Sequence, residues 1–154
     1  MNDDAVGDDM HRSKLVEVPM EVVLLIVAGI VAYFVSKAFK NNAAAGDNLD
    51  AIAKDNGLNT FYRCYVTDGI VGLDDTQNAM VWVSKTDKSA FKILRAGDIR
   101  RVRHETKPFH NKTDNKIVFT TNDVRNPTLT LDFGLGTKPA EDFHQRIGIL
   151  FNLT

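Results

Sequence analysis

The sequence predicts an α+β chain that is mainly β: an N-terminal transmembrane helix, then a small antiparallel β-barrel or sandwich capped by a C-terminal helix. Three observations predict this architecture. The run Val22–Val35 holds only apolar residues and no charge. Seven short segments rich in β-branched and aromatic residues follow, separated by polar turns. The last segment of the chain carries one apolar stripe at helical spacing.

Residues 1–17 form an acidic tail that we expect to be disordered, because it has few large hydrophobic side chains. Residues 18–40 are predicted to be the transmembrane helix. Met20–Ser36 alone would extend roughly 25 Å as a helix, close to the thickness of a bilayer core. Lys37 and Lys40 can extend their ammonium groups toward the headgroups, which lengthens the apolar segment.

Two alternatives to a membrane span remain open. Ala43–Gly46 offers small residues that a signal peptidase accepts, so the apolar run could be a cleaved signal. The acidic residues before the run and the lysines after it argue against export. A buried helix of a soluble domain is the third reading of the same residues.

Basic residues near the apolar run indicate its orientation. Lys37, Lys40 and Lys54 follow it, whereas Arg12 and Lys14 precede it. The positive-inside bias therefore favours a cytoplasmic C-terminal domain on a single-pass protein of the inner (plasma) membrane. The single cysteine, Cys64, fits a reducing compartment, and we expect it to be a small half-buried hydrophobe.

Residues 41–59 are predicted to be a linker and a short helix. Asn41–Gly46 is rich in small residues and is expected to leave the membrane as a linker. Asp47 can cap a helix that places Leu49, Ile52 and Ala53 on one face, and Asn56-Gly57 supplies its end.

Residues 60–154 are predicted to form one β domain. Seven strands are expected, at Thr60–Val66, Gly69–Leu73, Ala79–Val83, Phe91–Leu94, Ile99–His104, Lys116–Thr121 and Thr128–Phe133. Glu105–Asn115 is expected to be a long loop. The closing helix begins near Thr137, and its stripe should bury Phe143, Ile147 and Leu150 against Trp82, Leu131 and Phe133.

Part of this domain resembles bacterial pleckstrin-homology-like domains. The similarity lies in the strand order, in the passage Gly69–Asp75 before the strand that bears Trp82, and in Phe91–Leu94 with Asp98–Val102. It covers Phe61 to Leu153. The resemblance implies a barrel capped by a C-terminal helix and a binding or scaffolding role, with no catalytic residues to carry over. One span followed by such a domain is similar to small bacterial and phage proteins of uncharacterised function.

The densest group of charges is basic and is centred on the fifth expected strand. It comprises Arg95, Arg100, Arg101, Arg103, His104 and Lys107. Strand alternation places Arg101 and Arg103 on one face, and Arg100, Val102 and His104 on the other. The patch could contact an acidic protein or anionic lipid headgroups, or its charges could only keep an edge strand from aggregating.

No catalytic, metal-binding or cofactor motif stands out in the sequence. The histidines lack zinc-ligand spacing, and a net charge of −1 gives no indication of nucleic-acid binding. The sequence therefore predicts a membrane-anchored, non-enzymatic module that recruits a protein or lipid partner. The alternative is a structural subunit of an envelope or secretion assembly, packing through Ala28, Gly29 and Ala32, and an oligomer is possible.

Overall fold

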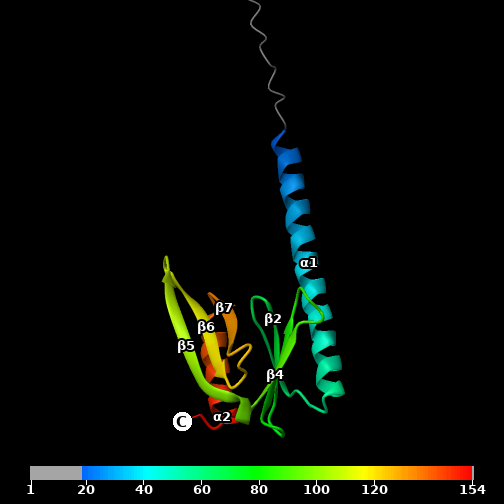
Figure 1. The fold of residues 1–154 in the computed structure, drawn as a ribbon. Helices are drawn as coiled ribbons and strands as arrows, with labels where there is room; N and C mark the ends of the chain where they lie inside the picture. Colours follow the sequence, from blue (N-terminus) through cyan, green and yellow to red (C-terminus); the bar gives the residue numbers. More distant parts are fainter. Residues whose placement is uncertain (1–18, 154) are drawn as a thin grey trace, which may run out of the picture. The chain divides into compact units, whose positions relative to one another are not determined.

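The computed structural model describes residues 19–153 and shows one long helix, two antiparallel sheets and a second helix (Figure 1). The predicted acidic tail lies outside the described residues. Contacts divide the chain into two compact units, the first ending at Ser36 and the second beginning at Lys37. Helix α1 (Met20–Asp55) contributes to both units, which are described separately below.

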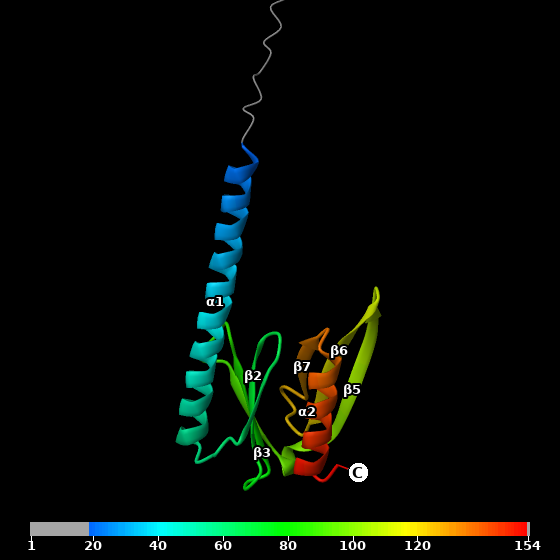
Figure 2. The same cartoon turned by 180° about the vertical axis from the view of Figure 1, so that it is seen from behind.

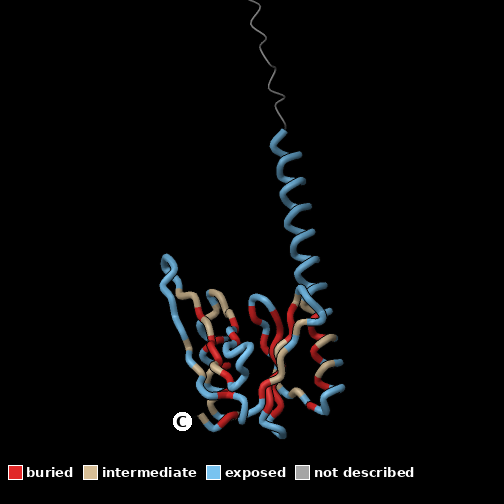
Figure 3. Tube along the Cα trace, viewed as in Figure 1, coloured by how far each residue is buried: buried red, intermediate tan, exposed pale blue. Residues whose placement is uncertain are grey.

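The first unit consists of the apolar part of α1. Every described residue up to Ser36 is exposed (Figure 3). Its most apolar 18-residue window has a mean hydropathy of 2.3, and none of that window is buried. The helix is therefore long and apolar enough to cross a membrane, by length and composition.

The second unit contains a four-stranded and a three-stranded sheet. Sheet A has the order β1 (Tyr62–Tyr65), β2 (Gly69–Asp74), β3 (Ala79–Ser84) and β4 (Phe91–Arg95). Sheet B has the order β5 (Ile99–Phe109), β6 (Lys112–Thr121) and β7 (Thr128–Gly134). All neighbouring strands are antiparallel. Helix α2 (Thr137–Leu150) contacts all three strands of sheet B (Figure 2).

The α+β, mainly β class is confirmed, and of the two predicted arrangements, barrel or sandwich, the described residues form two separate sheets and no closed barrel. Among the described residues, strand pairing stays within each sheet. The chain leaves sheet A through the 3-10 turn η1 (Ala96–Asp98), where the Asp98 carboxylate accepts a hydrogen bond from the Arg95 N–H at 2.8 Å. This turn ends one ladder and redirects the chain into the other, so the two sheets pack as separate layers.

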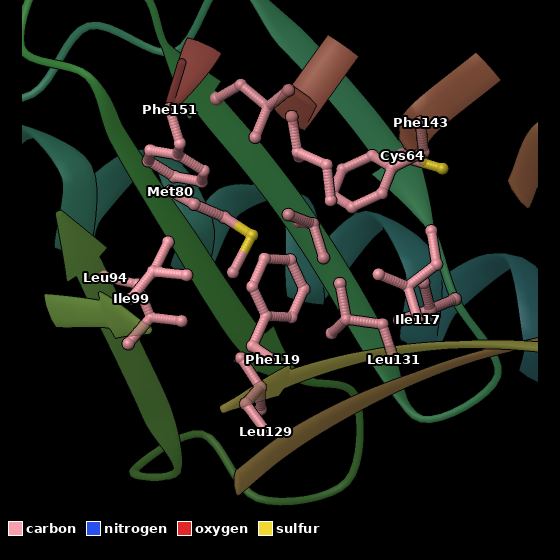
Figure 4. Packing of buried hydrophobic residues seen from close by; sticks show 14 residues of the cluster. Cys64, Met80, Leu94, Ile99, Ile117, Phe119, Leu129, Leu131, Phe143 and Phe151 are labelled. Atoms are coloured by element: carbon pink, nitrogen blue, oxygen red, sulfur yellow. The ribbon is translucent and has the colours of Figure 1, made fainter. Parts of the chain in front are cut away.

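The main hydrophobic core lies between the two sheets and α2 (Figure 4). Leu131, Phe143 and Ile147 are fully buried there, as the sequence predicted. Trp82, Phe133 and Leu150 are half-buried and pack against the same cluster. The apolar stripe of α2 thus joins the core that both sheets share.

A second core lies on the other face of sheet A. It is formed by the last turns of α1 and by residues of β2 and β3; its buried members are Ala45, Leu49, Ala53, Leu58, Ile70, Ala79, Val81 and Val83. Gly72 permits the close approach of the chain here. A Cβ at that position would lie 2.7 Å from the Thr60 Cγ2 and 3.1 Å from the Leu49 Cδ2.

The predicted linker at Asn41–Gly46 is wrong, because α1 continues through it without interruption. Alanines are the strongest helix formers, and Ala45 is buried against sheet A, so propensity and packing act together. The expected shared face of Leu49, Ile52 and Ala53 is present. The helix ends before Gly57, whose φ of 68° is left-handed.

The predicted long loop at Glu105–Asn115 is also wrong, since these residues extend β5 and β6 into a hairpin. Phe109 pairs with Lys112 across a two-residue turn at His110, which has a φ of 52°. The end of this hairpin is exposed on β5 from Glu105 onward. Because this end of β5 has no buried face, it has no apolar alternation, and its sequence resembles that of a loop.

Candidate functional site

Strand β5 forms an edge of sheet B and is the longest strand in the described part of the chain. Within residues 19–153, its backbone pairs only with β6. The other sheet edges are shorter, and the β7 edge is partly covered because the Thr67 N–H donates to the Asp132 carbonyl at 2.7 Å. An open edge of this length can pair with another chain.

A β-bulge near the start of β5 sets which side chains face the core. The register with β6 shifts between Ile99 and Arg101, which leaves Arg100 as the extra residue. Ile99 and Val102 consequently both contact the core although they are three residues apart. Arg101 and Arg103 are exposed and His104 is half-buried, which fits the expected alternation of these three residues.

Asn122 holds the bulge in place from the loop after β6. Its amide nitrogen donates to the Gly97 carbonyl at 2.7 Å, and its backbone N–H donates to the Asp98 carbonyl at 2.8 Å. The Asn122 side-chain oxygen accepts a hydrogen bond from the Arg100 Nε. The Arg100 guanidinium is thus oriented by a loop that is itself tied to η1.

The predicted basic cluster separates into three parts. Arg95 donates to the Gln77 side chain at 3.0 Å, so its guanidinium is engaged at the β2–β3 turn. His104 turns toward the interior. Arg103 pairs with Glu105 at 3.2 Å, whereas Arg101 and Lys107 have no ion pair or side-chain hydrogen bond with any described residue. The basic surface that remains is the β5 row of Arg100, Arg101, Arg103 and Lys107.

His104 is held by a buried amide that the sequence gave no reason to single out. Asn115 is fully buried, and its nitrogen donates to the Thr113 carbonyl at 2.8 Å and the Thr137 hydroxyl at 3.2 Å. Its oxygen therefore faces the His104 Nε2, 3.2 Å away. An amide oxygen only accepts, so this Nε2 carries the hydrogen. The β-bulge between Asn115 and Lys116 is a feature of the strand pairing, so the sequence alone offered no signal for this residue.

The imidazole of His144, on α2, lies beside that of His104, with ring centroids 5.7 Å apart. Burial lowers the pKa of His144 below its ordinary value, and the charge of His104 lowers it further. Both effects favour the neutral form of His144.

The end of α2 turns the chain back toward the strands. Asn152 adopts a left-handed φ of 51°, and the Leu153 N–H donates to the Gly148 carbonyl at 3.0 Å. The Asn152 N–H donates to the Ile149 carbonyl at 3.2 Å, which completes a Schellman-type end. This turn packs Leu153 against the core, next to β5.

A groove of about 360 Å³ lies between β5 and the C-terminal end of α2, and is called here the β5–α2 groove. It is lined by Arg100, Arg101, Val102, His144, Ile147, Gly148 and Leu153. Its lining is therefore apolar at the base and basic at the rim. Gly148 leaves space, since a Cβ there would meet only the Leu153 carbonyl oxygen, at 4.0 Å.

Other candidate residues show no site of comparable definition. Among residues 19–153, no group of three or more histidine, cysteine or acidic side chains could hold a metal ion. Cys64 is buried, and this burial raises the pKa of its thiol, which disfavours the reactive thiolate. Ala28, Gly29 and Ala32 are exposed on α1, and a packing role for them stays a prediction.

Comparison of the chain with models of known protein families, with curated proteins and with solved structures finds no match.

Proposed function

We propose that this protein is a single-pass, membrane-anchored interaction module without enzymatic activity, which recruits an anionic partner through β5. The observation that carries this proposal is the row of exposed basic side chains on an open edge strand. Arg101 and Lys107 have no partner among the described residues, so their charges are available to a ligand. Anchoring would raise the local concentration of this surface at the membrane.

A pleckstrin-homology-like fold for the second unit is part of the proposal. The order of four antiparallel strands, then three, then a helix that packs on the shared core supports this part of the proposal, although the barrel that the resemblance implies is not closed in the described residues. The absence of a continuous ladder between the sheets makes this an open version of that architecture.

Membrane insertion and orientation are also part of the proposal. The exposed apolar surface of α1 up to Ser36 supports insertion, because such a helix gains stability when lipid covers it. The basic residues Lys37, Lys40 and Lys54 support a cytoplasmic second unit.

Full-length protein should remain in membranes after carbonate washing. A cysteine at the exposed Ser89 should escape an impermeant thiol reagent in intact cells.

Binding is tested with the full chain in phosphatidylcholine nanodiscs. Two anionic probes are offered separately, phosphatidylserine vesicles and poly-glutamate, at low and at physiological salt. At least one should bind at low salt and weaken as salt rises, since exposed charges are screened over about 8 Å at physiological ionic strength. Arg100→Gln/Arg101→Gln/Arg103→Gln should abolish binding.

The control removes three exposed lysines elsewhere, Lys54, Lys88 and Lys138, also to glutamine. It has the same net charge as the arginine variant, and it should keep the binding. Equal losses in both variants, or no binding of either probe by the native chain, would overturn the proposed function.

A further inference from the structure

We propose that the β5–α2 groove receives an extended acidic segment of a partner protein, which pairs with β5 as an additional strand of sheet B. This inference rests on the proposed function and specifies its partner. It combines three features at one place in the fold: an open strand edge, an adjacent groove and two guanidinium groups that no described carboxylate pairs with.

The edge supplies the backbone contacts. β5 runs from Ile99 to Phe109, and among the described residues its backbone bonds only to β6, apart from the Ile99 N–H, which donates to the Ala96 carbonyl. Alternate N–H and C=O groups on its other side can therefore pair with an incoming strand, as in β-strand addition. Such contacts give affinity for any extended chain, so selection must come from side chains.

The groove supplies pockets for side chains. Side chains of an added strand alternate between two faces, so every second residue would point toward α2. There it meets Val102, Ile147 and Leu153, with space left by Gly148. A partner segment should therefore carry apolar residues at alternate positions.

The rim supplies the charge preference. Arg100 and Arg101 line the groove, and no described carboxylate pairs with either of them. Guanidinium groups bind carboxylates through paired hydrogen bonds, so acidic residues next to the apolar ones complement this rim. A second copy of β5 fits poorly, because its own arginines would repel these. Lipid headgroups would leave the strand edge and the apolar base unused.

The test measures fluorescence anisotropy of labelled peptides with the full chain in phosphatidylcholine nanodiscs. The probe is a short peptide of alternating Glu and Val. One comparison peptide replaces Glu by Lys, and another keeps the Glu-Val sequence but carries an N-methyl group on every backbone nitrogen. Only the unmethylated acidic peptide should bind well. Methylation should weaken binding by about tenfold or more, because several backbone hydrogen bonds are lost.

Two variants locate the peptide. Gly148→Phe should fill the groove and weaken binding, whereas Gln145→Phe, on an exposed part of α2 that does not line it, should not. Arg100→Gln/Arg101→Gln should weaken binding without touching the helix. Fluorescence of Trp82, the only tryptophan, checks that each variant is folded.

Equal binding of the methylated peptide would contradict pairing of the peptide with β5 as an added strand. Unchanged binding by Gly148→Phe would contradict binding of the peptide in the β5–α2 groove. Binding of phosphatidylserine vesicles or poly-glutamate without discrimination among the peptides would overturn this inference and leave the proposed function standing. If no anionic probe binds at all, the proposed function fails as well.

Discussion

Sheets A and B differ both in strand length and in how they are covered: the strands of sheet A have four to six residues, and those of sheet B have seven to eleven. The two central strands of sheet A are covered on both faces: every residue of β2 and all but one of β3 are buried, with the end of α1 on one side and the shared core on the other. Sheet B has one covered face, and its β7 alternates between exposed threonines and buried leucines. Its β5 edge also remains open.

This difference in cover indicates that sheet A has mainly a structural role and that sheet B offers the surface for a partner. A sheet enclosed on both faces can offer a partner only its edges, and those of sheet A are short. Sheet B presents a long edge, a basic row and a groove beside α2. Sheet A, with the end of α1 packed on it, is joined to β5 through η1.

The largest expected effect on stability comes from Phe143→Ala, which removes a side chain that contacts residues of both sheets. The Phe143 ring is fully buried, 5.5 Å between centroids from Phe133 of β7 and 6.4 Å from Tyr62 of β1. Its removal should lower the free energy of unfolding by about 3–5 kcal/mol. Denaturation of the full chain in detergent, followed by Trp82 fluorescence, measures this loss.

The control for that variant is Ile149→Ala on the same helix, where the side chain is 83% exposed. It should change the stability by no more than about 0.5 kcal/mol. A loss below about 1 kcal/mol for Phe143→Ala would show that α2 does not join the two sheets into one core.

A second variant, Leu49→Ala, tests whether the end of α1 belongs to the folded domain. Leu49 is fully buried over Gly72 of β2, so its truncation should cost about 2–5 kcal/mol. Ile52→Ala, at a half-buried position on the same helix, should cost less. Equal and small losses in both variants would mean that sheet A is stable without its helix cover.

The strand pattern could be predicted from the sequence because turns and alternation mark it locally. β7 was found through the alternation of Leu129, Leu131 and Phe133 with polar residues, and α2 through its stripe. The sequence analysis did not predict that the end of α1 covers sheet A, although the sequence of two of its strands indicates burial on both faces. Gly69–Asp74 and Ala79–Ser84 do not alternate, which is typical of strands buried on both faces.

The basic residues of β5 were identified from sequence, but the groove was not. Its shape depends on the bulge at Arg100 and on the left-handed Asn152, and both arise from pairing between distant segments. Asn122, which orients Arg100, lies on the far side of β6. Composition and spacing along one strand carry no information about such contacts.

The smallest expected effect is on how the stability of the fold depends on pH, because His144 beside sheet B and Asp74 in sheet A affect it in different pH ranges. Because the pKa of His144 in the fold lies below its ordinary 6.5, the unfolded chain takes up a proton first as the pH falls. Stability linked to His144 is therefore fully present above about pH 6.5 and declines as the pH falls below it.

In sheet A, burial acts to raise the pKa of Asp74, but hydrogen bonds from Thr76, Asn59 and Gln77 outweigh it and lower the pKa below 3.8. The stability that depends on the ionised Asp74 carboxylate is therefore lost only in stronger acid. Denaturation midpoints of the native chain should thus fall between about pH 7 and pH 5, and His144→Gln should flatten that slope while leaving the steeper loss near pH 3. An unchanged slope in His144→Gln would place the titration outside the β5–α2 groove.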